Sequence, residues 1–309
     1  MISLVGPTAV GKTPVSLNLA NALRAEIVSA DSMQVYRRMD IGTAKPTAAE
    51  RAIAPIHLID IIDPDQDWTL ADFQRDGREA CLAIERRGNV PLVVGGTGLY
   101  VRALTTQLDI PTVAPNEEFR AQWRQLAAER GNAYLQSELA MIDPEAAARI
   151  HVNDVNRLIR ALEVHAALGV SISELHAANK ASLAGQDAML IALNYADRRT
   201  LYSKIDERVD QMVTEGLVDE VRGLLADGYA RGLKAMKSLG YRHMAGYLEG
   251  ECNLDVAVDR MKCDTRHFAR RQLIWFRGDP RVNWVMVDDK STDQVVEEIL
   301  NLLSQSTSK

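Results

Sequence analysis

Short apolar runs alternate along the chain with longer stretches in which apolar residues recur every three or four positions. Buried parallel strands read as continuous apolar runs, whereas amphipathic helices repeat about every 3.6 residues. The runs with the length of strands lie at residues 2–5, 26–29, 56–62, 90–94, 189–193 and 282–287. The stretches with helical spacing lie at residues 15–23, 69–87, 198–215, 217–225, 256–277 and 292–303. Strands that alternate with helices predict an α/β fold with a parallel sheet at its core.

The middle of the chain has a different pattern. After a proline-punctuated linker at residues 110–115, helical spacing continues to about residue 183 with almost no strand signal. We therefore expect a core in two parts, residues 1–115 and 188–309, which an all-helical insertion domain at residues 116–187 interrupts.

A glycine-rich turn connects the first strand to the first helix. Residues 6–13 read Gly-Pro-Thr-Ala-Val-Gly-Lys-Thr, the G-x-x-x-x-G-K-S/T pattern in the strand-turn-helix context that makes it a phosphate site. Loop amides and the helix N-terminus would surround phosphate oxygens, Lys12 would hold a bridging oxygen, and the Thr13 hydroxyl would bind Mg²⁺. The expected diphosphate ligands are Gly6, Thr8, Ala9, Val10, Gly11, Lys12 and Thr13. The loop predicts a P-loop core and a diphosphate ligand, unless it is a chance glycine turn.

Two further polar turns follow predicted strands. Asp31 comes directly after the second strand, and Thr97 lies in a Gly-Gly-Thr-Gly turn after the strand at residues 90–94. Ligands of open parallel sheets bind beyond the carboxyl ends of the strands, so we expect both side chains beside Lys12. A carboxylate there is a metal ligand or a general base, while a helix cap is the alternative for Asp31. For the glycines, the alternative is tight packing between strand and helix.

The charge is uneven along the chain. A net charge of −6 and a pI of about 5.6 argue against a uniformly basic nucleic-acid-binding protein. One late stretch nevertheless gathers Arg266, Arg270, Arg271, Arg277 and Arg281. Phe268, Trp275 and Phe276 lie among them, and mixed arginine and aromatic residues suit RNA, although an amphipathic helix has a similar pattern. Residues 37–46 also gather cations. This segment either contacts an anionic partner or is solvated surface.

The composition predicts a cytoplasmic protein. No apolar run approaches the length of a membrane span, and the chain begins with a strand pattern rather than a basic leader. Cys81, Cys252 and Cys263 lack the spacing of metal ligands, so we expect reduced structural thiols.

Five sequence blocks in order resemble the tRNA dimethylallyltransferases of bacterial type, also called tRNA isopentenyltransferases. The blocks are GPTAVGKT at residues 6–13, ADSMQVYRRMDIGTAKP at 30–46, GGTGLY at 95–100, KSLGYRHMAGYL at 237–248 and TRHFARRQLIWFR at 265–277. The resemblance covers essentially the whole chain.

The resemblance implies transfer of a dimethylallyl group from dimethylallyl diphosphate to the exocyclic amine of the adenine at tRNA position 37. It implies that Asp31 is the general base, that Thr97 is its partner at the amine, and that Arg208 reaches the diphosphate. The expected partners are a tRNA anticodon stem-loop and dimethylallyl diphosphate, with Mg²⁺ as cofactor, no membrane, and a monomeric protein.

The resemblance also implies a set of tRNA contacts. They are Asp31, Ser32, Met33, Gln34, Arg120, Asn156, Arg157, Arg160, Arg242, Arg266, Arg270, Arg271 and Arg277. The family often has Gln where Asn156 and His267 stand and Lys where Arg270 stands, so the sequence departs from the family on the RNA side.

Three other functions stay open at this point. A P-loop kinase of a small metabolite would explain the glycine loop and Asp31 but not the late arginines. A non-catalytic nucleic-acid-binding module would leave the glycine loop without a role. A transferase acting on free adenine nucleotide would share the chemistry, although the helical insertion and the arginines favour tRNA.

Overall fold

The chain forms two compact units. The computed structural model describes residues 1–106, 108, 110, 113–181 and 188–307. The first unit is Met1–Thr105 with Asp187–Lys309, and the second is Thr106–Gln186. The second unit begins earlier than the predicted insertion at residue 116. Part of the linker belongs to it because the Val113 carbonyl accepts hydrogen bonds from Arg160, at 3.2 Å.

A parallel sheet forms the centre of the first unit. Its strands are β1 Ile2–Val5, β2 Ala25–Ser29, β3 Ile56–His57, β4 Val90–Gly95, β5 Met189–Asn194 and β6 Val282–Met286. Among the described residues the sheet has six strands in the order β3-β2-β4-β1-β5-β6, and every neighbouring pair is parallel. The predicted α/β class is confirmed.

The strand predicted at residues 56–62 is shorter than expected. β3 ends after His57 because Leu58 and Asp60 have φ angles of 63° and 56°, which lie outside the extended conformation of a strand. The chain leaves the sheet there, and Ile62 returns only as an isolated bridge to Tyr36.

Helices cover the sheet, and their ends carry the expected signals. In the first unit they are α1 Lys12–Leu23, α2 Ala48–Ile53, α3 Leu70–Arg86, α4 Gly98–Thr105, α10 Arg198–Thr214, α11 Leu217–Ala226, α12 Tyr241–Leu248, α13 Leu254–Arg277 and α14 Thr292–Thr307. Thr69 caps α3 as predicted, through a reciprocal capping box with Asp72. No helix in the part of the chain that the structure describes is both long and apolar enough to cross a membrane.

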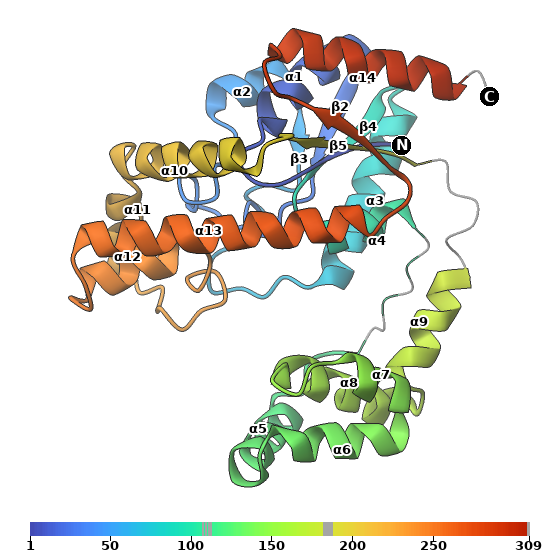
Figure 1. Cartoon of the computed structure of the whole chain (residues 1–309), viewed down its shortest axis with the longest axis vertical. Helices are drawn as coiled ribbons and strands as arrows, with labels where there is room; N and C mark the ends of the chain where they lie inside the picture. Colours follow the sequence, from blue (N-terminus) through green and yellow to red (C-terminus); the bar gives the residue numbers. More distant parts are fainter. Residues whose placement is uncertain (107, 109, 111–112, 182–187, 308–309) are drawn as a thin grey trace. The chain divides into compact units, whose positions relative to one another are not determined.

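The alternation of side chains along each strand divides the core of the first unit into two layers. Leu4, Ile27 and Leu92 face the layer that α1 and α14 cover. Their neighbours Val5 and Val28 face the opposite layer, which contains α3, α4 and the group α10 to α13. Figure 1 shows α14 and the long helix α13 on opposite sides of the sheet.

The second unit is helical throughout its described residues. Its helices are α5 Glu117–Arg130, α6 Asn132–Ile142, α7 Pro144–Arg149, α8 Val155–Leu168 and α9 Ile172–Ala181. They enclose a separate core around Leu135, Leu139 and Leu158, in agreement with the helical spacing of this part of the sequence.

The three cysteines are free thiols. Cys81 is buried in α3, and burial raises the pKa of its thiol to about 11, so this thiol stays protonated at neutral pH. Cys252 is partly exposed and Cys263 is exposed.

Candidate active site

Three polar turns meet at one edge of the sheet because β2, β4 and β1 are neighbours in that order. Ser29 of β2 pairs with Val94 of β4, and Val5 of β1 pairs with Gly95, so the three strands end at the same level. Asp31 follows β2, Thr97 follows β4, and the glycine loop follows β1. The turns also contact each other directly, since the Thr97 amide donates to the Ala30 carbonyl at 3.2 Å.

The glycine loop has the backbone that a phosphate site requires. Gly6, Ala9 and Gly11 have φ angles of 142°, 64° and 88°. A Cβ atom on Gly6 would lie 2.6 Å from the Leu193 carbonyl oxygen, so only glycine fits there. Lys12 Nζ donates to the carbonyls of Gly6 and Pro7 at 2.9 and 2.7 Å. The ammonium group therefore lies inside the loop.

The pKa of Lys12 is shifted far below its usual value. Burial, helped by the positive charge of Arg208, lowers the pKa of Lys12 to about 7, and the negative charge of Asp31 opposes this shift. Arg208 shares the environment, since burial lowers the pKa of its guanidinium while Asp31 and Glu215 raise it. Two desolvated cations with one nearby carboxylate form a site that favours a multivalent anion.

Asp31 is a partly buried carboxyl group rather than a helix cap. No helix in the described chain begins at Asp31; instead its Oδ1 accepts the Met33 amide at 2.8 Å in a local turn. Burial raises the pKa of Asp31, while the Met33 and Gln34 amides and the charges of Lys12 and Arg208 lower it. The net rise makes Asp31 a stronger base than an exposed aspartate, which suits proton removal.

Thr97 acts through its contacts to the Asp31 turn. Its Oγ1 accepts the Ser32 amide at 3.2 Å, and its carbonyl accepts the amides of Tyr100 and Val101 in the first turn of α4. The side chain thus connects the turn after β4 to the residue that follows Asp31.

Lys12, Asp31 and Arg208 line one cavity with a volume of about 740 Å³, whereas Thr97 is not one of its lining residues. Its walls include Lys12, Thr13, Asp31, Gln34 and Arg208. One wall is a single face of α10, formed by Lys204, Glu207, Arg208 and Gln211, and it continues into Glu215, which caps the helix. The volume is in the range of sites for small ligands and cofactors, about 300 to 1,000 Å³.

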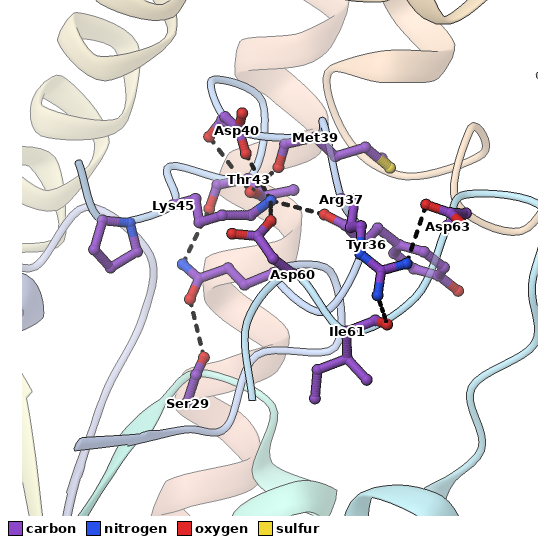
Figure 2. Close-up of polar contacts among 12 residues, drawn as sticks. Ser29, Tyr36, Arg37, Met39, Asp40, Thr43, Lys45, Asp60, Ile61 and Asp63 are labelled. Carbon is purple, nitrogen blue, oxygen red and sulfur yellow. Dashed lines mark hydrogen bonds and ion pairs between the residues drawn. The ribbon is translucent and has the colours of Figure 1, made fainter. Parts of the chain in front are cut away.

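The segment after Asp31 is folded around buried polar contacts (Figure 2). Lys45 Nζ donates to the Tyr36 carbonyl at 2.7 Å and to the carboxylates of Asp40 and Asp60, both at 2.6 Å. The side chain of Lys45 is fully buried. Its charge is therefore used within the fold, and it neither binds an anionic partner from outside nor lies on the solvated surface. Gln34 is also held internally, where its Oε1 accepts from Ser29 Oγ at 2.9 Å.

A carboxylate from α11 holds the tip of the same loop. Glu220 accepts the amides of Asp40, Ile41 and Gly42 at 2.9, 2.8 and 3.2 Å, and it also accepts the Tyr241 hydroxyl at 2.5 Å. A carboxylate that receives several backbone amides is a strong acceptor. Glu220 thereby fixes one wall of the cavity.

Replacing Lys45 by methionine is expected to lower the free energy of unfolding by about 2 to 3 kcal/mol, because it removes the buried partner of two carboxylates. The loss is smaller than for a fully buried pair because the side chains of Asp40 and Asp60 are 57% and 32% exposed. Urea unfolding of the variant and the wild type measures this loss in the free energy of unfolding. Arg38→Met in the same loop removes an exposed ion pair with Asp227 and is the control, expected to cost less than about 1 kcal/mol. Equal losses in both variants would contradict the role of Lys45.

The arginines expected at tRNA differ in their surroundings in the first unit. Arg242 pairs with Asp264 at 2.5 Å, and Arg266 pairs with Asp206 at 2.7 Å. The remaining three on α13, which are Arg270, Arg271 and Arg277, are exposed and form no ion pair within the described ranges. These three are the side chains best placed to take phosphates from solvent.

In the second unit, two of the expected arginines serve the fold. Arg120 and Arg160 both pair with Glu163, at 2.9 and 2.5 Å, and Glu163 is only 2% exposed. Arg157 is 76% exposed and lies 3.3 Å from Asp154, while Asn156 is exposed beside it. The tRNA contacts of these residues stay predictions, and Arg157 and Asn156 are more accessible for them.

Gln272 is a site residue that the sequence pattern did not reveal. It comes from α13, lines the cavity, and accepts the Thr8 amide at 2.9 Å. The Thr8 amide is therefore engaged within the protein, while Thr8 also lines the cavity, so its contact with diphosphate stays a prediction. The only local signal was a polar residue on the buried face of an amphipathic helix.

The residues present fit a magnesium ion that is held mainly by phosphate. The described residues contain no group of three or more His, Cys, Asp or Glu side chains that could bind a metal by themselves. Mg²⁺ in such sites takes one or two protein oxygens and completes its ligands with phosphates and water. The Thr13 hydroxyl lies at the first turn of α1 and lines the cavity, so it can supply such an oxygen.

The fold and the site together define an α/β protein of P-loop type, in which the glycine loop, Asp31 and Arg208 line one cavity. The family model described as IPP transferase matches residues 34–279, and that described as isopentenyl transferase matches residues 1–60. The chain belongs to the tRNA dimethylallyltransferase family, whose substrate is tRNA.

Individual relatives match over nearly their whole length. The tRNA dimethylallyltransferase of Roseiflexus castenholzii is 47% identical over 300 residues, which cover 97% of this chain and 97% of that protein. The tRNA dimethylallyltransferase of Carboxydothermus hydrogenoformans is 44% identical over 300 residues, with coverage of 97% and 96%.

Solved structures agree with this assignment. The full-length tRNA isopentenylpyrophosphate transferase of Bacillus halodurans matches with a TM-score of 0.72 and 41% identity, over 98% of this chain and 95% of that one. A eukaryotic dimethylallyltransferase acting on tRNA matches with a TM-score of 0.82 and 25% identity, over 99% and 79%.

Proposed function

We propose that this protein transfers the dimethylallyl group of dimethylallyl diphosphate to the exocyclic amine of the adenosine at tRNA position 37. The products are N6-dimethylallyladenosine in tRNA and diphosphate. The observation that carries the proposal is the cavity in which a partly buried carboxyl group, Asp31, shares its walls with the cations Lys12 and Arg208. Such a site can accept a proton at one place and hold a leaving anion at another.

Asp31 acts on the nucleophile. The adenine amine is a poor nucleophile because its lone pair is delocalised into the ring. As the new carbon–nitrogen bond forms, Asp31 takes the proton that the amine loses, and the raised pKa of this carboxyl group favours that transfer. Thr97, through the Ser32 amide, keeps the Asp31 turn in place.

The glycine loop and its cations act on the leaving group. When the allylic carbon–oxygen bond breaks, its electron pair stays on diphosphate, and negative charge grows on that oxygen. Loop amides, Lys12 and Arg208 stabilise the charge, each fixed donor being worth about 10²- to 10³-fold in rate. The Thr13 hydroxyl would help to hold Mg²⁺, and the ion would supply further positive charge for the leaving group.

The cavity also has to protect the reacting carbon from water. An allylic diphosphate that loses its leaving group in water is hydrolysed, so transfer requires a site that excludes solvent. An adenine that is flipped out of the RNA and inserted into a closed pocket meets this requirement, as in other enzymes that modify bases.

Alanine at Arg270 or at Arg271 is expected to weaken tRNA binding and to reduce its salt dependence. Removing one cation from a phosphate lowers the slope of log affinity against log salt by about 0.7 to 0.9. Both arginines are exposed on α13. Arg86→Ala on α3 is the control, because Arg86 is exposed near the start of β4, at the opposite edge of the sheet from the site. Filter binding at several salt concentrations measures the slope, and unchanged slopes in both α13 variants would contradict the RNA contact.

A divided assay tests the proposed function. Purified protein, Mg²⁺ and labelled dimethylallyl diphosphate are incubated with unmodified tRNA in one reaction and with AMP in another. Label in tRNA that maps to position 37 is the expected result. Label in AMP alone would assign the chain to transferases of free adenine nucleotides, and label in neither would overturn the proposal and lead to a test for kinase activity.

A further inference from the structure

One side chain of α13 connects two of the three turns that form the active site. Gln272 Oε1 accepts the Thr8 amide of the glycine loop at 2.9 Å, and its Nε2 donates to the Gly96 carbonyl at 3.0 Å. The side chain is buried, with 7% of the residue exposed. Both ends of its amide group are therefore used to join the phosphate loop to the turn that carries Thr97.

The turn after β4 is shaped to receive this glutamine. A Cβ atom on Gly96 would lie 2.1 Å from Gln272 Nε2, so residue 96 has to lack a side chain for the contact to exist. Apart from Gln272, the nearest atom to this Cβ would be the Gly6 carbonyl oxygen, at 3.4 Å. The requirement for glycine at position 96 thus comes from one contact, that with Gln272.

The same helix contacts the turn a second time, one turn further along. A Cβ atom on Gly98 would lie 2.1 Å from Trp275 Cδ1, so the indole packs directly on the backbone of this glycine. The residues just before Gln272, which are Arg270 and Arg271, are exposed to solvent. Helix α13 therefore exposes cations to solvent, while its side chains Gln272 and Trp275 contact the turns of the site.

We propose that Gln272 is a positioning residue, which sets the separation between the diphosphate-binding loop and the turn that aligns Asp31 through Thr97. The inference rests on the proposed function, because it assigns the two turns to the leaving group and to the base. Gln272 itself does not contact the reacting atoms. It fixes the distance between the groups that do, and a misplacement of about 1 Å in such groups lowers rates by about 10²-fold.

The isosteric substitution Gln272→Met tests the role, since it keeps the volume and removes both hydrogen bonds. Expected is a fall in kcat of about 10- to 100-fold, with the Kd for tRNA unchanged, because the exposed face of α13 is not altered. The matched control is Gln74→Met in α3, where a buried glutamine donates to the Ala103 carbonyl at 3.0 Å, away from the turns of the site. It is expected to lower stability without a comparable change in kcat.

Gly96 provides a second variant that does not depend on how well the first one folds. Gly96→Ala forces the glutamine out of its position and is expected to lower kcat as Gln272→Met does. In a Gln272→Ala background the added methyl group has space, so the double variant is expected to be no slower than Gln272→Ala alone. Such non-additivity identifies Gln272 as the partner through which Gly96 acts.

The outcomes separate the two proposals. Wild-type protein that transfers no label to tRNA overturns the proposed function and this inference with it. Wild-type protein that is active, together with Gln272→Met protein at the wild-type kcat, overturns the inference alone. Additive losses in the Gly96→Ala and Gln272→Ala double variant would also overturn it, since Gly96 would then act independently of the glutamine.

Discussion

Asp31→Asn protein is expected to turn over about 10³- to 10⁴-fold more slowly than wild type while it binds tRNA with unchanged affinity, since a positioned base contributes up to about 10⁴-fold. Asparagine keeps an oxygen that can accept the Met33 amide, now at 2.8 Å from Asp31 Oδ1, so the turn is preserved. It cannot take the proton of the adenine amine. Single-turnover transfer to a tRNA anticodon stem-loop, measured with saturating dimethylallyl diphosphate, reports the chemical step.

The control for Asp31 is a second carboxylate in the same cavity. Glu207→Gln changes a carboxylate that lines the cavity but is 57% exposed and pairs with Lys204 at 2.8 Å. We expect it to change turnover by less than about 3-fold, because an exposed ion pair contributes little. An Asp31→Asn protein that keeps more than a tenth of the wild-type turnover would show that another group removes the proton.

The strand-end rule accounts for the part of the site that could be read from the sequence. Asp31, Thr97 and the glycine loop each follow an apolar run, and the rule requires only that these runs form neighbouring parallel strands. The order β2-β4-β1 meets that condition. The rule works because it depends on local signals, a strand followed by a turn, and not on which distant side chains pack together.

Residues that act across the fold have no such local signal. Gln272 and Thr8 are separated by 264 positions, and Glu220 and Asp40 by 180. Both contacts depend on how α11 and α13 pack against the sheet, which hydrophobic periodicity does not specify. The role of Lys45 was missed for a related reason, since its burial follows from the positions of Asp40 and Asp60 in a folded loop.

The arginines show why residue type alone does not identify a nucleic-acid contact. Arg120 and Arg160 fit the expected pattern as well as Arg157 does, yet they hold the buried Glu163 between α5, α8 and the linker. An arginine that forms an ion pair with a buried carboxylate of its own fold is less available for RNA. For Arg120 and Arg160 this availability depends on Glu163. The sequence predicts that Glu163 lies in a helix, but it does not show that Glu163 faces these two side chains.

Lys12→Met protein is expected to lose about 10²- to 10³-fold in kcat/KM for dimethylallyl diphosphate, because it lacks a fixed cation at the leaving group. Methionine has a similar length and carries no charge, so the loop can keep its backbone conformation. The loss is expected in kcat as well as in KM, since the charge on the leaving oxygen grows as the bond breaks. Steady-state kinetics at saturating tRNA separate the two terms.

The pH dependence of the same variant gives a sharper test. The pKa of Lys12 is lowered to about 7 in the free protein, so the ammonium form that holds diphosphate is lost as pH rises above that value. Wild-type kcat/KM is therefore expected to fall above about pH 7, and diphosphate binding is expected to take up a proton because the anion restores the charged form. The raised pKa of Asp31 acts in the opposite direction, since its base form is lost as pH falls.

Lys12→Met protein should lack the alkaline fall and the proton uptake, because its side chain does not titrate. Ionisation of the diphosphate itself is common to both proteins and cancels in the comparison. Calorimetric titration with diphosphate in two buffers of different ionisation enthalpy measures the uptake at pH 8, above the pKa of about 7 for the free Lys12. Equal uptake in both proteins would mean that Lys12 is already charged without ligand, and that burial and Arg208 do not hold its pKa down.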